Sequence, residues 1–158
     1  MLEQTEHQDQ QSWQSPGLKT SWNGSEFDGV LKDDVSSVWP HVEKLITSGL
    51  DYTDGTLRSE DVLEELLNKS MQLWVSRRNG KVEAVCITTL KEYATTKICE
   101  FVVVAGNNMQ NWIEFEGVIM AWARSHKCDK ARAVFAREGW LRAALDWKRA
   151  ATIIEKVL

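Results

Sequence analysis

The sequence predicts one α/β domain with a mixed β-sheet, helices on both sheet faces and the element order α-α-β-β-β-α-β-α-β. Three observations predict this class. Two amphipathic helical segments precede every strand-like segment. Asn79 and Gly80 separate a loosely alternating run, 71–78, from a run rich in Val, Ile and Thr, 81–90, which is the pattern of an antiparallel hairpin. Residues 97–137 read as strand, helix and strand, and a crossover of that length implies parallel pairing.

The composition is that of a globular protein. The chain has 158 residues, which favours one domain with its own hydrophobic core. Hydrophobic residues make up 43% and charged residues 27%, so we exclude a collagen-like or wholly disordered chain. We also expect no membrane span and no secretory signal, because the sequence has no long apolar run and no basic N-terminal start. An intracellular protein is therefore expected.

Residues 1–33 are predicted to form an irregular arm ahead of a domain over residues 34–158. Gln, Ser, Asp and Gly dominate the arm, and it shows no sustained hydrophobic period. Trp13, Trp22 and Phe27 are nevertheless costly to leave in water. We expect them to lie in grooves, either of their own domain or of a neighbour.

Two short helices are predicted next. The first runs from Asp34 to Gly49, because its apolar residues share one stripe and Pro40 stands in its first turn. The second begins at Ser59, a favourable N-cap that two acidic residues follow. Strands are then expected over residues 71–78, 81–90 and 97–105, and the third is apolar on both faces, as in a covered central strand, apart from Glu100.

The second half of the domain is predicted from residues 110–158. A helix over residues 110–126 is apolar around much of its circumference, so the sheet and a second element must cover it. The arm or a partner subunit would be that second cover. A strand at 130–137, a helix at 138–148 and a last strand at 152–158 complete the order.

Charge is distributed unevenly along the chain. Residues 1–70 contain 5 Lys and Arg against 14 Asp and Glu, whereas residues 124–158 contain 9 against 4. The basic final quarter could attract nucleic acid or an anionic cofactor. Alternatively, acidic and basic faces neutralise each other in the fold or between subunits, and no basic run is interleaved with aromatic residues.

The cysteines predict neither disulfides nor a metal site. Cys86, Cys99 and Cys128 form no Cys-x-x-Cys pair, so we expect reduced thiols, the first two of them in the core. His126 lies two residues from Cys128, but no third or fourth ligand stands at metal-binding spacing.

An Asn-Gly hairpin that leads into a central strand and then a long helix resembles the fold of GCN5-related N-acetyltransferases (GNATs) over residues 34–158. The segment 99–126, followed by Arg137, Gly139 and Trp140, resembles small GNAT-like proteins from the structural gene clusters of tailed bacteriophages. This resemblance implies a virion-associated or assembly protein, found in the virion or the host cytoplasm. Its partners would be other phage structural proteins or copies of itself.

GNAT enzymes hold the diphosphate of acetyl-CoA in a glycine-rich loop between the central strand and the long helix. The resemblance places the matching groups at Gly106, Asn107, Asn108 and Gln110. This loop has one glycine and no cation.

Glu114 and Glu116 are expected in the first turns of the following helix, where they would repel a diphosphate. At about 6–8 Å and an effective dielectric near 20, each such pair costs on the order of 2 kcal/mol. We therefore expect no cofactor, with acetyl-CoA binding as the alternative.

The resemblance also indicates where catalytic groups would lie. Many GNAT enzymes use a carboxylate on the central strands as base and a tyrosine on the penultimate helix as acid. Glu100 is the candidate base, and the alternative is a surface carboxylate or one paired with an Arg. The predicted penultimate helix contains no tyrosine, since the two in the chain are Tyr52 and Tyr93.

Tryptophan is abundant, with eight residues in the chain, and protein interfaces favour this residue. We predict a contact surface that includes the aromatic residues Trp13, Trp22, Phe27, Trp112, Trp122, Trp140 and Trp147.

The sequence thus favours a non-catalytic GNAT-like domain that docks onto phage structural proteins. An acetyl-CoA-dependent N-acyltransferase with Glu100 as base is the alternative. A nucleic-acid-binding accessory protein that uses the basic final quarter is a third possibility.

Overall fold

The computed structural model describes residues 20–108, 111, 113–134 and 146–158. These residues form one sheet with the strand order β1-β2-β3-β4-β5-β6. The elements in chain order are β1 (Thr20–Trp22), β2 (Ser25–Gly29), α2 (Lys32–Leu50), α3 (Ser59–Leu67), β3 (Gln72–Arg78), β4 (Lys81–Glu92), β5 (Lys97–Gly106), the 3-10 turn η3 (Ile113–Phe115), α4 (Glu116–Ser125) and β6 (Lys130–Ala133).

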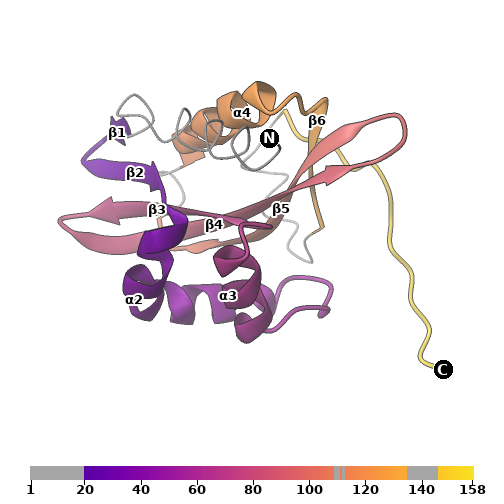
Figure 1. Ribbon diagram of the computed structural model, residues 1–158, viewed down its shortest axis with the longest axis horizontal. Coiled ribbons are helices and arrows are strands. Elements are labelled where there is room, and N and C mark those ends of the chain that lie inside the picture. The colour runs from indigo at the N-terminus through magenta and orange to yellow at the C-terminus, as the bar shows by residue number, and fades with distance from the viewer. Residues whose placement is uncertain (1–19, 109–110, 112, 135–145) are drawn as a thin grey trace, which may run out of the picture.

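The predicted α/β class is confirmed. Neighbouring strands from β1 to β5 are antiparallel, and β5 and β6 are parallel, as the crossover length predicts. Figure 1 shows α2 and α3 on one face of the sheet and α4 on the other. The sheet therefore has helices on both faces.

Residues 20–29 correct the prediction of an irregular arm. β1 and β2 form an antiparallel hairpin, and β2 continues the sheet by pairing with β3. Asn23 and Gly24 at the turn have φ angles of 49° and 82°, the left-handed conformation that Asn and Gly adopt at low cost. Asn79 and Gly80 in the predicted hairpin have nearly the same angles, 52° and 76°.

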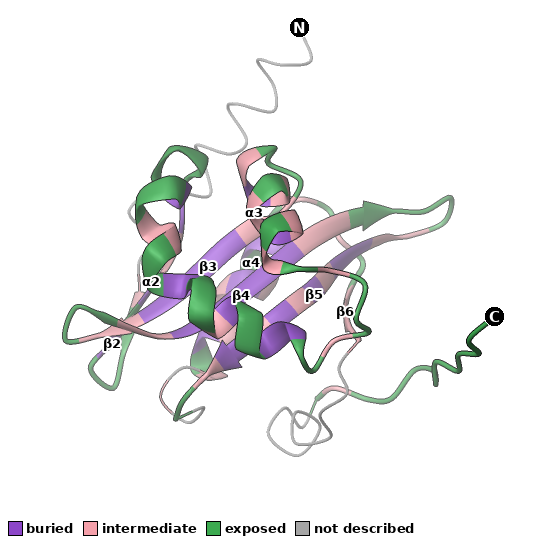
Figure 2. Ribbon diagram, turned by 90° about the horizontal axis from the view of Figure 1, so that it is seen from below, coloured by how far each residue is buried: buried purple, intermediate pink, exposed green. Residues whose placement is uncertain are grey.

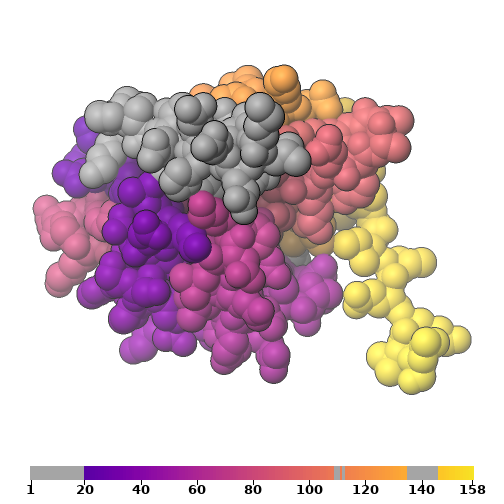
Figure 3. Space-filling model, in the orientation of Figure 1, coloured from indigo at the N-terminus to yellow at the C-terminus, as the bar shows by residue number. Residues whose placement is uncertain are grey.

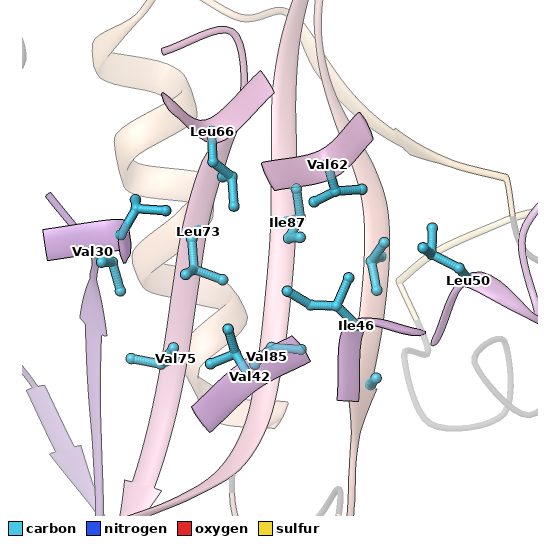
Figure 4. Packing of buried hydrophobic residues seen from close by; sticks show 13 residues of the cluster. Val30, Val42, Ile46, Leu50, Val62, Leu66, Leu73, Val75, Val85 and Ile87 are labelled. Carbon is cyan, nitrogen blue, oxygen red and sulfur yellow. The ribbon is translucent and has the colours of Figure 1, made fainter. Parts of the chain in front are cut away.

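Aliphatic side chains fill the space between the sheet and the helices α2 and α3. Figure 4 shows Val42 and Ile46 of α2, with Val62 and Leu66 of α3, packed against residues of the strands. Each of these four side chains is at most 2% exposed. Figure 2, seen from this side, shows burial concentrated on the central strands and exposure on the outer surfaces of both helices.

Two predicted helix ends need correction, the C-terminal end of α2 and the N-terminal end of α3. α2 continues past Gly49 to Leu50, and Gly49 is buried where the helix approaches β5. A Cβ at Gly49 would lie 2.6 Å from Val103 Cγ1, so the missing side chain allows this approach. Ser59 is the first residue of α3 rather than its cap, and the N–H of Arg58 donates a hydrogen bond to Asp61 Oδ2 at 2.8 Å.

Aromatic side chains dominate the opposite face, beneath α4. Phe27 stacks on Phe115, with ring centroids 4.7 Å apart, and Trp74 meets Trp122 edge to face at 5.2 Å. The buried Trp74 also donates a hydrogen bond from Nε1 to Thr88 Oγ1 at 3.0 Å. Phe27 therefore belongs to the core through the hairpin that carries it.

The C-terminal part differs most from prediction. β6 covers residues 130–133 of the predicted strand 130–137, and residues 135–145, with most of the predicted helix 138–148, lie outside the described ranges. Residues 152–158 form no strand and are exposed. A strand needs a neighbour to pair with, and no described strand pairs with these residues.

Candidate functional site

A β-bulge changes the course of β5 at Val102. Ile87 of β4 pairs with Val103, but the next residue, Thr88, pairs with Phe101. Val102 is therefore an extra residue, and such a bulge bends its strand and changes which face later side chains occupy.

The side chains of β5 show this change of face. Cys99 and Phe101 belong to the aromatic cluster beneath α4, whereas Val103 and Ala105 belong to the aliphatic cluster beneath α2 and α3. By the alternation of side chains along a strand, Glu100 faces the α2 and α3 side.

β6 pairs with β5 only up to this bulge. Their parallel register runs from Ile98 opposite Lys130 to Phe101 opposite Ala133. Beyond that point, within the described residues, no strand pairs with the β6-side edge of Val102–Gly106. Backbone groups alternate in direction along a strand, so part of the N–H and C=O groups of this segment point to the open edge. An extended ligand with amide groups could hydrogen-bond there, as an added strand would.

Four polar side chains meet where β5 and β6 are still paired. Arg132 of β6 donates to Glu100 Oε2 from Nη2 at 2.8 Å and from Nε at 3.2 Å. Lys91 Nζ lies 3.4 Å from Glu100 Oε1. Arg132 also donates to the Tyr93 hydroxyl at 2.9 Å, with its guanidinium 5.5 Å from the centre of the Tyr93 ring.

The electrostatics of this cluster follow from these contacts. Hydrogen bonds to Glu100 and Tyr93 raise the pKa of the Arg132 guanidinium, so it stays charged. The Lys91 side chain is 48% exposed and makes a single, longer contact to the carboxylate. Its position at Oε1 is therefore the one that another cation could take.

The sequence identifies only part of this cluster. Glu100 is the predicted base, and the alternative of a carboxylate paired with an Arg describes what the structure shows. Arg132, Lys91 and Tyr93 are not predicted as members, because only the register of the parallel pair brings Arg132 opposite Glu100. Tyr93 lies in the connection between β4 and β5.

The predicted cofactor loop leaves β5 at Gly106. The φ angle of Gly106 is 155°, and a Cβ there would lie 2.6 Å from the carbonyl oxygen of Glu83. The same oxygen accepts a hydrogen bond from the N–H of Asn107 at 3.1 Å, so this amide already has a protein partner. Asn108 is exposed and has a φ angle of 54°. The contacts of Gly106 and Asn107 are thus directed to β4.

Two carboxylates lie near the start of the following helix. Glu114 is exposed in η3, and Glu116 is the first residue of α4 and is half-buried. Burial raises the pKa of the Glu116 carboxyl, while a hydrogen bond donated by Trp147 Nε1 acts in the opposite direction. Neither side chain favours an anion at this helix end.

The described residues of the predicted aromatic contact surface differ in their exposure. Phe27 and Trp122 are 5% exposed and lie in the aromatic cluster beneath α4. Trp147 is half-buried and meets Phe101 edge to face at 5.4 Å. Trp22 is 50% exposed. Four predicted site residues lie outside the described ranges: Trp13, Gln110, Trp112 and Trp140.

The described residues contain no group of three or more His, Cys, Asp or Glu side chains that could hold a metal ion. His126 Nδ1 instead lies 3.0 Å from the carbonyl oxygen of Trp122. All three cysteines are free thiols, and burial raises the pKa of Cys99 to about 12. No helix in the described part of the chain is long and apolar enough to cross a membrane.

The sequence matches no protein-family model and no curated protein. Solved structures nevertheless share its fold. An aminoglycoside acetyltransferase from an uncultured soil metagenomic sample aligns with a TM-score of 0.59 at 11% identity, over 86% of this chain and 97% of that chain. A GCN5-related N-acetyltransferase from Ralstonia eutropha aligns with a TM-score of 0.59 at 14% identity, over 85% and 99%. A predicted acetyltransferase from Clostridium acetobutylicum, solved with acetyl-CoA, aligns with a TM-score of 0.57 at 8% identity, over 84% and 96%.

At identities of 8–14%, these comparisons bear on the fold alone. They confirm the expected GNAT-like fold. They give no support to the resemblance to proteins of phage gene clusters.

Proposed function

We propose that this chain, which has the fold of the GCN5-related N-acetyltransferases, transfers an acyl group from acyl-CoA to an amine. One observation carries the proposal: the open edge of β5, at Val102–Gly106, lies directly beside the cluster around Glu100. A donor held along that edge would have its reactive end within reach of a carboxylate. The acetyltransferase structures that share the fold support the same class of reaction.

The open edge suits one part of the donor better than another. Acyl-CoA supplies the thioester, and its extended pantetheine arm carries amide groups that can pair with the backbone of Val102–Gly106. The diphosphate would be bound more weakly. The N–H of Asn107 already donates to the carbonyl oxygen of Glu83, and the nearby Glu114 carries negative charge. Pairing along β5 would therefore contribute most of the donor affinity.

Glu100 is the residue that would prepare the acceptor. An amine is protonated near neutral pH and must lose a proton before it attacks a thioester. In the proposed site the acceptor's ammonium displaces Lys91 from Oε1, and Arg132 keeps the carboxylate in place through its two hydrogen bonds to Oε2. Glu100 then accepts the proton. As the C–N bond forms and the C–S bond breaks, the Tyr93 hydroxyl, which accepts a hydrogen bond from Arg132, could donate a proton to the leaving thiolate. The proton that the attacking nitrogen gives up as it becomes an amide would then restore the tyrosine.

The test is acetyl transfer to a panel of primary amines that includes an aminoglycoside and an N-terminal peptide amine, followed by release of the CoA thiol. Glu100→Gln should lower kcat/KM about 100-fold or more, because it removes the proton acceptor but keeps the shape. Lys91→Met should not lower kcat/KM, since it removes only the cation that competes with the acceptor.

Asp28→Asn is the matched control. Asp28 forms an ion pair with Arg77 at 2.6 Å, between β2 and β3 and therefore far along the sheet from β6. Equal losses in Glu100→Gln and Asp28→Asn would contradict a catalytic role for Glu100. Failure of every amine to release thiol, in a protein that binds acetyl-CoA, would contradict the transferase proposal.

The other functions considered from the sequence have weaker support. The virion-associated role rests on the resemblance to phage proteins alone. Nucleic-acid binding by the basic final quarter stays a prediction, and Arg132 in that quarter is already paired with Glu100.

A further inference from the structure

Glu83 is an extra residue in β4. Ser76 of β3 pairs with Ala84 of β4. The next residue of β3, Arg77, pairs with Val82, so Glu83 has no partner in this pair of strands. The extra residue of such a bulge is left out of the regular ladder, and its strand bends there. The position of the Glu83 backbone therefore depends on the other contacts of this residue.

The carboxylate of Glu83 makes three of these contacts. Its Oε1 accepts hydrogen bonds from the hydroxyls of Ser25 and Ser76, the second at 3.0 Å. Its Oε2 lies 3.4 Å from Nε of Arg78. Both serines are at most 1% exposed, and the Glu83 side chain is 12% exposed. A carboxylate this far from water is held by its partners, because leaving its charge unpaired would be costly.

Ser25 brings the hairpin of β1 and β2 into this cluster. It is the first residue of β2 and pairs with Arg78. Nη2 of Arg78 also donates a hydrogen bond to the carbonyl oxygen of Asn23, in the hairpin turn, at 2.6 Å. Figures 1 and 3 show this indigo hairpin beside the pink turn between β3 and β4, at one end of the sheet. The hairpin is thus attached to β4 by a side chain as well as to β3 by the ladder.

The backbone of Glu83 contacts the loop that follows β5. Its carbonyl oxygen accepts the hydrogen bond from the N–H of Asn107 at 3.1 Å, one residue beyond the pair of Ala84 with Gly106. A Cβ at Gly106 would lie 2.6 Å from the same oxygen, so glycine allows the loop to approach it. Glu83 therefore connects the N-terminal hairpin, through its side chain, with the end of the open half of β5, through its backbone.

We propose that Glu83 is a positioning residue for the acyl-CoA donor. Its carboxylate, held by Ser25 and Arg78, fixes the bulge of β4. The carbonyl of the same residue then fixes the loop at Asn107, where the donor would leave the open half of β5. The effect on the donor rests on the proposed acyl transfer, whereas the hold on Asn107 does not. Through Glu83 the N-terminal hairpin would thus contribute to donor binding.

The first experiment measures amide hydrogen exchange in the full chain without any ligand. Glu83→Gln keeps the size of the side chain, but its NH₂ group cannot accept from Arg78 as Oε2 does. We expect the amide of Asn107 to exchange about tenfold or more faster in this variant than in the natural chain. Ser25→Ala should have a smaller effect in the same direction. Ser21→Ala is the matched control, since Ser21 is exposed in the same hairpin, and it should leave the exchange unchanged.

Steady-state kinetics of acetyl transfer test the effect on the donor. Glu83→Gln should raise KM for acetyl-CoA about fivefold, as expected for the loss of about one hydrogen bond, and should change kcat less than about twofold. Lower stability alone would not raise KM, because the folded molecules would bind the donor as before. Since Ser25 acts through Glu83, the double variant should have the KM of Glu83→Gln alone. Urea denaturation checks that the variants are folded.

Three results would overturn the proposal. They are unchanged exchange at Asn107 in Glu83→Gln, additive effects of the Ser25 and Glu83 substitutions on KM, and a fall in kcat at constant KM. If the natural chain transfers no acyl group, the proposed function fails separately. Faster exchange at Asn107 in Glu83→Gln would then still support the positioning of this loop by Glu83, and unchanged exchange would still contradict it.

Discussion

The two halves of β5 are held in the sheet by different means. Residues 97–101 pair with β4 on one edge, residues 98–101 also pair with β6 on the other, and Glu100 adds ion pairs to Arg132 and Lys91. Residues 102–106 pair with a described strand on the β4 edge alone, and helix α2 packs closely on their face through Gly49. Packing on one face can therefore position a strand whose edge is left open.

The difference separates two chemical properties within one strand. The closed half gathers titratable side chains, and the open half contains only apolar residues and Gly106. In the proposed enzyme the open half would bind the donor through its backbone, and the closed half would act on the acceptor. The bulge at Val102 marks the border between them.

The largest effect on this arrangement is expected from Gly106→Ala. A Cβ at Gly106 would lie 2.6 Å from the carbonyl oxygen of Glu83, at a φ angle of 155° that other residues rarely adopt. Backbone strain and overpacking together predict a loss of about 3 kcal/mol or more in the free energy of unfolding. Urea denaturation measures this loss.

Gly80→Ala is the matched comparison, because Gly80 also has a positive φ, 76°, but open space around its Cβ position. We expect it to cost about 1 kcal/mol. Equal losses in the free energy of unfolding would contradict this explanation, because close packing against β4 would then add nothing to the cost at Gly106.

The sequence predicts most of the fold because its main signals are local. The helical stripe of α2, the Asn79-Gly80 turn and the apolar run of β5 can each be read within one segment. The hairpin at Asn23-Gly24 carries the same local turn signal, but the residues around it are mostly polar and do not show a strand pattern. Its place in the sheet depends on the pairing of β2 with β3. The missing last strand depends on a partner that the segment itself does not contain.

The site is less predictable because the pairing register of the strands, and no local sequence pattern, brings its residues together. Glu100 stands out as an acidic residue in an apolar strand, whereas Arg132 is 32 residues away and joins it only through parallel pairing. The bulge at Val102 follows from a mismatch between β4 and β5 that neither strand shows alone. Such features depend on tertiary pairing, which a local pattern does not specify.

A smaller effect is expected at Glu116, at the start of the helix that covers the closed half. Burial raises the pKa of its carboxyl in the folded state, so at a pH between the unfolded and folded values the folded protein binds a proton that the unfolded chain lacks. The stability of the folded state therefore falls as pH rises through that window. Glu116→Gln keeps an acceptor for Trp147 but carries no charge.

We expect Glu116→Gln to be slightly more stable than the natural chain at pH 7, by no more than about 0.5 kcal/mol. The advantage should shrink as the pH is lowered toward the ordinary carboxyl range, as urea midpoints at several pH values would show. Glu114→Gln, at an exposed position in η3, serves as control. An advantage of Glu116→Gln that is independent of pH would contradict the role given to its charge.

The most direct test of different roles for the two halves of β5 is a titration of the isotope-labelled protein with acetyl-CoA, followed through its backbone amide resonances. We expect the amides of residues 102–106 to shift progressively and more than those of residues 97–100. Absence of any shift at millimolar acetyl-CoA, or shifts centred outside the open half of β5, would contradict it.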